Sequence, residues 1–328
     1  MAFLWPALVA ESASEFASAA ARGFVHLAMG PEPTSIPEPQ WATRNRVVFE
    51  HSSTITDFAP HHSLVAALQG AGIRRLAVTG WRSASPSMRF LSIDNYLADL
   101  NVLVDELGGA VDLIGLCQGG WMALVYAARF PAKIRKLVLA GAPIDIAAGA
   151  SKLSDLARNT PMAIFRELVE LGGGRILGQH ALRFWEPHAP DGATIRELLQ
   201  CSPGTSPGAL RKLESRFRDW YAWTLDLPGT YYLQVVERLF KDNQLANGRF
   251  VALGRKTDLS NVRCPLFLLA ARDDDVVARE QIFAIEHLVD NQRCMVDKTV
   301  APCGHLGLFM GKQILADVWP SVARWLLR

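Results

Sequence analysis

The stretch VDLIGLCQGGWMALVYAARF, residues 111–130, decides the fold that this sequence predicts. Its first six residues form an apolar run of strand length, and residues 119–130 have the pattern of a helix. Between them, Gly115-Leu116-Cys117-Gln118-Gly119 follows the pattern G-x-C-x-G. We expect glycines at both ends because a side chain there would collide with the neighbouring strand and helix. The stretch therefore predicts a sharp strand-to-helix turn that presents Cys117 as a nucleophile.

Strands and helices alternate on both sides of this turn, which favours a parallel sheet with helices on both faces. The predicted strands are residues 46–50, 75–79, 111–116, 136–140, 265–271 and 295–300, and the predicted helices are residues 62–71, 93–107, 119–130, 281–289 and 312–327. Residues 145–262 break the alternation, because they have helical periodicity and many aromatic side chains but few clear strands. An alternating chain with such a turn is typical of the α/β-hydrolase fold. The sequence therefore predicts an α/β-hydrolase core with a mainly helical insertion that roofs the site; an unrelated helical lobe is the alternative.

Three parts are predicted along the chain. Residues 1–44 hold an amphipathic helix, over residues 8–29, and a proline-rich linker. Residues 45–145 and 263–328 form the α/β-hydrolase core, and residues 146–262 form the helical cap.

The composition excludes several classes of protein. Lys and Arg total 34 against 32 for Asp and Glu, and a formal charge of +2 gives no electrostatic footprint for nucleic acid. The longest apolar stretches are far shorter than the roughly 20 residues that span a bilayer. The N-terminus lacks the basic start of a signal peptide. The five cysteines are scattered without a C-x-x-C pair, so we expect no disulfide framework, no metal site and a reducing, cytoplasmic location.

Cysteine at the turn indicates thiol chemistry. The thiol stands at the start of a helix, and the helix dipole favours its thiolate. The backbone N–H of Gln118 would point towards the oxyanion that forms on an attacked carbonyl. The second oxyanion donor is expected from residues 51–53, with Ser52 as the candidate. A cysteine on an apolar strand is more often inert packing, but the flanking Gly115 and Gly119 favour a nucleophile.

The acid and the base are expected after late strands, because the order in this fold is nucleophile, acid, histidine. Three carboxylates, residues 273–275, follow the strand over residues 265–271. Asp274 is the predicted acid because the pattern D-x-x-V places the acid three residues before Val277. Asp145 is a rival, since some hydrolases take the acid after an earlier strand. His305 is the predicted base because it lies in the loop between the last strand and the last helix.

Six segments resemble the polyhydroxyalkanoate synthases, particularly the short catalytic subunits of the two-subunit type. They are DFAPHHSLVAAL, GWRSASPSMRFLSIDNYL, GLCQGGWMALVYAARFP, LPGTYYLQVVERLFKDNQLANGRF, PLFLLAARDDDVV and GHLGLFMG, in the family's order from about residue 55 to residue 325. The catalytic residues of the family map onto Cys117, Asp274 and His305. The resemblance implies transfer of a 3-hydroxyacyl group from coenzyme A to the cysteine, followed by attack of a hydroxyl at the end of a growing polyester. The coenzyme A thioester is then a substrate, and no resident cofactor is expected.

This chain departs from the family at three places. Before the first helix of the core it has one strand candidate, residues 46–50, and a short loop, where the family usually has a longer strand region. At the acid, the family commonly has Asp-His and this chain has Asp274-Asp275. At an earlier segment, the family commonly has Asp-Trp and this chain has Gly80-Trp81. The resemblance also implies a partner subunit and contact with polyester granules, and a homodimer stays open. The helix predicted over residues 8–29 would either touch such a surface or pack on the body.

Two other functions compete with acyl transfer. One is a cysteine-dependent hydrolase, such as an intracellular polyhydroxyalkanoate depolymerase or a thioesterase, because a triad does not record whether water or an alcohol accepts the acyl group. The other is a non-catalytic granule or scaffolding protein that retains the fold.

Overall fold

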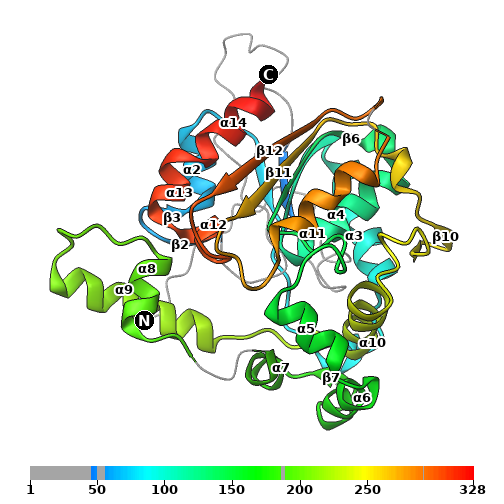
Figure 1. The fold of residues 1–328 in the computed structure, drawn as a ribbon, viewed down its shortest axis with the longest axis horizontal. Coiled ribbons are helices and arrows are strands. Elements are labelled where there is room, and N and C mark those ends of the chain that lie inside the picture. Colours follow the sequence, from blue (N-terminus) through cyan, green and yellow to red (C-terminus); the bar gives the residue numbers. More distant parts are fainter. Residues whose placement is uncertain (1–45, 50–55, 186–188, 291) are drawn as a thin grey trace.

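Six parallel strands form the central sheet of the computed structural model, which describes residues 46–49, 56–185, 189–290 and 292–328 (Figure 1). In spatial order they are β12 (Val296–Ala301), β11 (Leu266–Ala271), β6 (Ile134–Ala140), β5 (Val111–Leu116), β1 (Arg46–Phe49) and β4 (Leu76–Val78). Every adjacent pair is parallel. The parallel sheet predicted from the alternating pattern is therefore confirmed.

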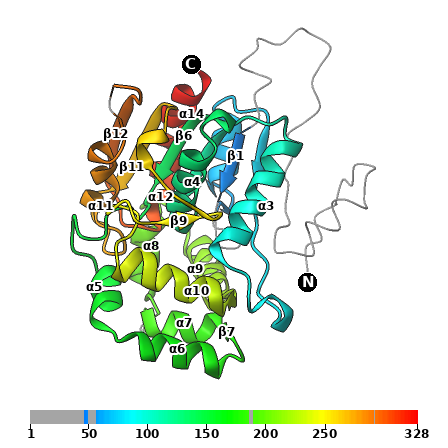
Figure 2. The ribbon, with the colours of Figure 1, turned by 90° about the vertical axis from the view of Figure 1, so that its right-hand side faces the viewer.

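Helices cover both faces of this sheet, as Figures 1 and 2 show. One face carries α3 (Ile93–Glu106), α4 (Gln118–Arg129) and α11 (Arg279–Phe283), and the other carries α2 (Leu64–Gly70), α13 (Lys312–Asp317) and α14 (Trp319–Leu327). Side chains of β5 alternate between the two cores: Leu113 packs with the first set of helices and Ile114 with the second. Because both faces are covered, all six residues of β5 are buried, which explains why the strand is apolar apart from Asp112.

The predicted helices are present, with local differences that have physical reasons. Helix α2 begins at Leu64 because His62–Ser63 form a short strand, β3, with β2 (Asp57–Ala59), and because the Ser63 hydroxyl accepts a hydrogen bond from the Ala66 N–H. The last predicted helix is divided into α13 and α14, since Pro320 near the start of α14 has no N–H to continue a helix. The helix predicted over residues 281–289 is α11 followed by a 3-10 turn, η5 (Ala284–His287).

The described residues between 146 and 262 are mainly helical, and the helices up to residue 234 lie beyond the carboxyl ends of the strands (Figures 1 and 2). The helices are α5 (Lys152–Asn159), α6 (Met162–Leu171), α7 (Gly178–Trp185), α8 (Gly192–Leu198), α9 (Pro207–Ala222), α10 (Gly229–Gln234) and the π-helix η3 (Val235–Lys241). The short strands are β7 (Arg175–Ile176), β8 (Leu227–Pro228), β9 (Val251–Ala252) and β10 (Arg255–Lys256). Helices α6 and α10 share a small core around Phe165 and Tyr232. The three-part division of the chain stays a prediction.

No helix in the described part of the chain is long and apolar enough to cross a membrane. The helix predicted over residues 8–29 and the proline-rich linker lie outside the described residues.

Candidate active site

Cys117 lies at the tip of the turn between β5 and α4. Its backbone has φ 48° and ψ −117°, a conformation that side-chain-bearing residues rarely adopt. The turn is held from both sides: the Cys117 N–H donates to the Ala140 carbonyl (2.9 Å), and the Gly120 N–H donates to the Cys117 carbonyl (2.9 Å). Cys117 is half-buried rather than sealed in the core. The local geometry is therefore that of a nucleophile elbow.

Crowding around the elbow explains its glycines. A Cβ on Gly115 would lie 2.6 Å from the Gly120 Cα and 2.8 Å from the Ala123 Cβ, so the collision predicted for this position exists. A Cβ on Gly120 would lie 2.3 Å from the Ala142 Cβ. Gly119 is buried, but the tight approach to the next strand falls on Gly120, which the sequence analysis missed. The doubled glycine at residues 119 and 120 was the available signal.

Asp274 is the carboxylate that meets the histidine. Its Oδ2 lies 2.8 Å from the His305 Nδ1, while its Oδ1 accepts the N–H groups of Val276 (2.9 Å) and Val277 (2.8 Å). The Asp274 side chain is 1% exposed. The spacing D-x-x-V therefore has a structural reason, because the carboxylate closes a turn over the next residues and is fixed in orientation.

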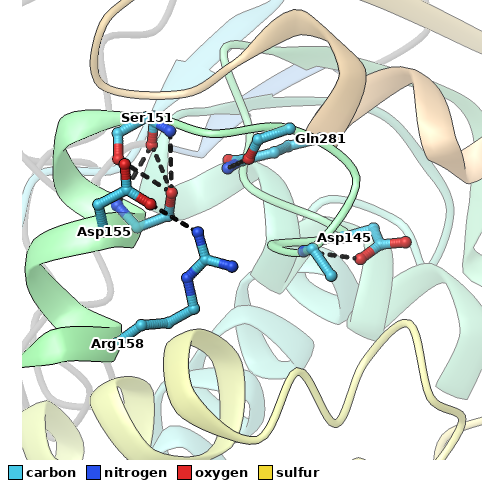
Figure 3. Close-up of polar contacts among 8 residues, drawn as sticks. Asp145, Ser151, Asp155, Arg158 and Gln281 are labelled. Atoms are coloured by element: carbon cyan, nitrogen blue, oxygen red, sulfur yellow. Dashed lines mark hydrogen bonds and ion pairs between the residues drawn. The ribbon is translucent and has the colours of Figure 1, made fainter.

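The other candidate carboxylates are engaged elsewhere. Asp273 pairs with Arg272 on the surface, and Asp275 pairs with Lys152 of α5. Asp145, the rival acid, accepts hydrogen bonds from the Ala147 N–H (3.0 Å) and the Asn243 Nδ2 (2.7 Å). Its own N–H donates to the carbonyl of Gln281, the residue that Figure 3 places beside it. The structure thus assigns the histidine partner to Asp274.

His305 follows β12 and precedes α12 (Gly307–Met310), in the loop where the base was expected. With Nδ1 bonded to Asp274, Nε2 is the nitrogen left to act on the Cys117 thiol. Burial lowers the pKa of His305, but the negative charges of Asp274 and Cys117 outweigh burial and hold the pKa well above its usual value. The structure brings the cysteine, histidine and aspartate together, although they are far apart in sequence.

Gly141 lets the imidazole approach. It has φ 55°, and a Cβ there would lie 3.1 Å from the His305 Cε1. The ring of Phe309 meets the imidazole edge-on, with centroids 5.5 Å apart. Nothing in the local sequence pattern identified Gly141, because its neighbour comes from a loop more than a hundred residues later.

An aromatic wall, formed by Trp81, Tyr96 and Tyr231, packs in the same core as helix α4, which begins next to Cys117. Trp81 stacks on Tyr96 with centroids 4.0 Å apart, and Tyr231 meets both rings edge-on. The Tyr231 hydroxyl donates to the Met122 sulfur (3.5 Å) on α4. Burial, and after it the charges of Tyr96 and Cys117, raise the pKa of Tyr231. Trp81, which keeps the tryptophan of the family's Asp-Trp pattern next to the departing Gly80, therefore belongs to this wall.

Of the two expected oxyanion donors, the structure describes Gln118 but not Ser52. Gln118 is the first residue of α4, and the first N–H groups of a helix have no partner within the helix. Its side-chain oxygen accepts the Trp121 indole N–H (2.9 Å), so the side chain is turned along the helix. Ser52 lies outside the described residues, and its role stays a prediction.

Cys303, which lies two residues before His305 in the chain, differs from Cys117. Burial raises the pKa of the Cys303 thiol to about 12, so this thiol is packing, as the sequence suggested. Within the described ranges no group of three His, Cys, Asp or Glu side chains could hold a metal ion.

The parallel sheet, the elbow and the order of its polar residues define an α/β-hydrolase fold. Two solved structures share it: the monoacylglycerol lipase of Paleococcus ferrophilus (TM-score 0.54, 17% identical, covering 86% of this chain and 93% of that one) and the non-heme bromoperoxidase BpoC of Mycobacterium tuberculosis (TM-score 0.52, 15% identical, covering 92% and 97%).

The proteins that this chain resembles in sequence include poly(3-hydroxyalkanoate) polymerase subunits. This chain is 27% identical to the poly(3-hydroxyalkanoate) polymerase subunit PhaC of Synechocystis sp., over 83% of this chain and 74% of that protein. It is 24% identical to the same subunit of Allochromatium vinosum, over 83% and 76%. Residues 205–328 match the family described as PHB de-polymerase C-terminus. These similarities confirm the resemblance to the polyhydroxyalkanoate synthases that the sequence motifs indicated.

Proposed function

We propose that this protein is an acyltransferase of the polyhydroxyalkanoate synthase type, which moves 3-hydroxyacyl groups from coenzyme A through Cys117 to a growing polyester. The observation that carries the proposal is a cysteine, rather than a serine, at the elbow of a chain related to polymerase subunits over most of its length. A thiol suits this reaction because loading exchanges one thioester for another, with little loss of free energy.

Loading begins when the His305 Nε2 takes the Cys117 proton. The sulfur then attacks the thioester carbonyl, and the new carbon–sulfur bond forms as the bond to coenzyme A breaks. The coenzyme A sulfur leaves with the proton from His305. Asp274 keeps the imidazole in the tautomer that turns Nε2 to the sulfur and balances its charge. The backbone N–H of Gln118 is the proposed oxyanion donor.

Transfer repeats the same proton movements with a different attacking group. His305 takes the proton of the hydroxyl at the polymer end, and the oxygen attacks the Cys117 thioester. The ester bond forms, the carbon–sulfur bond breaks, and the thiolate regains its proton. The buried aromatic wall of Trp81, Tyr96 and Tyr231 would limit the entry of water, which competes with the hydroxyl.

A hydrolase with the same residues is the second candidate, because residues 205–328 match a family described by a de-polymerase. Water would then take the acyl group from Cys117. The two candidates share every residue named above and differ only in the acceptor. A partner subunit, a homodimer and a granule surface remain predictions of the resemblance.

The deciding experiment gives the purified protein 3-hydroxybutyryl-CoA and identifies the products. Insoluble polyester together with free coenzyme A is the expected result, whereas free 3-hydroxybutyrate without polymer would show the hydrolase instead. Cys117→Ala should abolish release of coenzyme A. Cys201→Ala, which removes another half-exposed thiol, serves as the control and should leave it unchanged.

Cys117→Ser tests the leaving group separately. We expect at least a hundredfold loss of polymer formation, because an alkoxide is a poorer leaving group than a thiolate and an alcohol a weaker nucleophile. Polymerisation at a nearly normal rate by the serine variant would contradict the thioester route.

A further inference from the structure

A cavity of about 280 Å³ lies in the helical insertion, between the start of α7 and the loop that joins α9 to β8. Its lining includes Gln179, His180, Ala222, Trp223, Thr224 and Asp226. None of the three proposed catalytic residues lines it. Small-molecule sites commonly begin near 300 Å³, so this cavity suits part of a large ligand rather than the whole of one.

The walls of the cavity favour a flat, hydrogen-bonding ring. Trp223 is 60% exposed, which leaves the indole face open for stacking. Gln179, His180 and Thr224 offer donors and acceptors around it. Arg183 lies one turn further along α7 than Gln179 and is exposed, so it can meet a phosphate beside the cavity. Stacking on an aromatic ring, edge hydrogen bonds and a nearby guanidinium are the features that bind a purine nucleotide.

The cavity is held in shape by hydrogen bonds around Asp226. The carboxylate accepts the Gly178 N–H (2.9 Å) and the Arg175 Nη1 (3.2 Å). The Asp226 N–H donates to the Ser83 hydroxyl (3.0 Å), and the Ala84 N–H donates to the Asp226 carbonyl (2.9 Å). A site fixed before its ligand arrives loses less entropy on binding.

The same hydrogen bonds link the cavity to the segment that carries Trp81. Ser83 and Ala84, which bind Asp226, come two and three residues after Trp81 of the aromatic wall. Tyr231 of that wall comes five residues after Asp226, a separation of at most about 18 Å along an extended chain. The Tyr231 hydroxyl contacts Met122 on the helix that begins next to Cys117. Hydrogen bonds and short chain segments therefore connect the cavity, the aromatic wall and the helix that begins next to Cys117.

We propose that this cavity binds the adenine end of coenzyme A while the thioester lies at Cys117. The adenine stacks on Trp223, the phosphates lie towards Arg183, and the pantetheine arm runs past residues 83 and 84 towards Cys117. This inference rests on the proposed function, since it assumes a coenzyme A thioester as the acyl donor.

The test compares two acyl donors, 3-hydroxybutyryl-CoA and the truncated 3-hydroxybutyryl-N-acetylcysteamine, which lacks the nucleotide. In Trp223→Ala the ratio of kcat/KM for the coenzyme A thioester to that for the truncated thioester should fall about tenfold, the order expected from losing one base–aromatic stack. The loss should appear in KM. Trp223→Phe keeps an aromatic face and should retain most of the ratio. Met295→Ala, which alters an exposed apolar side chain outside the cavity, is the matched control.

A second readout needs no turnover. Adenosine 3′,5′-bisphosphate should quench the fluorescence of the wild type and of Met295→Ala, and should bind Trp223→Ala at least tenfold more weakly by equilibrium dialysis. If the wild type makes polyester but Trp223→Ala keeps the wild-type ratio and affinity, the cavity is not the nucleotide subsite and the proposed function stands. If the wild type transfers acyl groups from neither donor, the proposed function itself fails.

Discussion

His305 and Asp274 form a nearly buried pair, with side chains 7% and 1% exposed. Burial alone would favour the neutral imidazole and lower the pKa of His305. The pKa is raised instead because the neighbouring negative charges stabilise the protonated ring. The Asp274 carboxylate is itself fixed by two backbone N–H groups, which leaves one oxygen free to orient the ring. The chemistry proposed for Cys117 therefore depends on how the Asp274 carboxylate is held against His305.

Asp274→Asn should lower the pKa of His305, because burial then acts without the carboxylate. The titration of the His305 ring, followed by NMR in the wild type and the variant, measures this change. An unchanged titration curve would mean that Asp274 does not control the imidazole.

The same pair predicts a dependence of stability on pH. The pKa of His305 is higher in the folded protein than the value of about 6.5 in the unfolded chain, so the pair stabilises the fold fully below about pH 6.5. This contribution is lost as the pH rises through the folded-state pKa. We expect Asp274→Asn to reduce the free energy of unfolding by about 2 kcal/mol at about pH 6, and by less on the alkaline side. Urea unfolding at several pH values checks it; a difference that grows with pH would contradict it.

The elbow depends on how closely helix α4 approaches strand β6. Gly120 in the first turn of α4 lies against Ala142, just beyond the end of β6, and the contact leaves no room for a methyl group. Close approach at this point allows the Cys117 N–H to reach the Ala140 carbonyl. The position of the nucleophile is thus set by the packing of one helix on one strand.

Gly120→Ala should destabilise the protein by about 1–3 kcal/mol, because overpacking outweighs the better helix propensity of alanine. Ala142→Gly in the same chain should restore part of this loss by removing the methyl group that collides. Urea unfolding of the single and double variants measures both effects. Gly208→Ala on α9 is the control: a Cβ there meets nothing within 4 Å, so the change should be neutral or slightly stabilising. Equal losses at both glycines would rule out the collision as the cause.

A buried ion pair joins two central strands at their amino ends. Arg46 of β1 and Asp112 of β5 are neighbours in register, both side chains are 0% exposed, and the Arg46 Nε lies 3.4 Å from the Asp112 Oδ2. Arg135 approaches the other carboxylate oxygen from β6. Such a pair fixes strand register more than it adds stability, because removing both charges from water is costly.

Arg46→Met should therefore lower the free energy of unfolding by about 3–5 kcal/mol, since it leaves Asp112 buried with only the more distant Arg135 as a partner. The double variant Arg46→Met, Asp112→Leu should recover most of the loss. As a comparison, replacing Arg158 breaks an exposed ion pair with Asp155 and should lower the free energy of unfolding by less than about 1 kcal/mol. Denaturant unfolding of the four proteins tests this, and a double variant as unstable as the single one would contradict it.

The whole fold places the five cysteines in very different surroundings. Burial raises the pKa of Cys264 and Cys303 to about 12 and that of Cys294 to about 11, and it also raises the pKa of the half-buried Cys201. Cys117 is half-buried too, but it stands at a helix start beside an imidazole. Thiolates, not thiols, react with electrophiles.

Iodoacetamide should therefore alkylate Cys117 of the folded protein first, with Cys264, Cys294 and Cys303 spared until unfolding. Peptide mass spectrometry over time gives the order. His305→Ala should slow alkylation of Cys117 by about tenfold, because the variant lacks the imidazole that is proposed to take the thiol proton. Faster labelling of Cys201 than of Cys117 would contradict this account of the elbow.

The parts of the site that sequence predicted have local causes. Cys117 was identified because the strand, the turn and the helix that present it are consecutive in the chain. Asp274 was identified by the spacing to Val277, and the structure shows that this spacing closes a hydrogen-bonded turn. Gly120, Gly141 and the Trp81–Tyr231 contact were missed, because each depends on a neighbour brought close by packing.

The sequence by itself determined the parallel sheet, the elbow and the candidate triad, because alternating apolar segments and short turn patterns are set by neighbours along the chain. Only the tertiary structure decided that Asp274 rather than Asp145 meets His305, that the aromatic wall packs on the helix of Cys117, and that a cavity forms in the helical insertion. These features join residues tens to hundreds of positions apart, and the path of the loops and the order of the strands determine which of them come into contact.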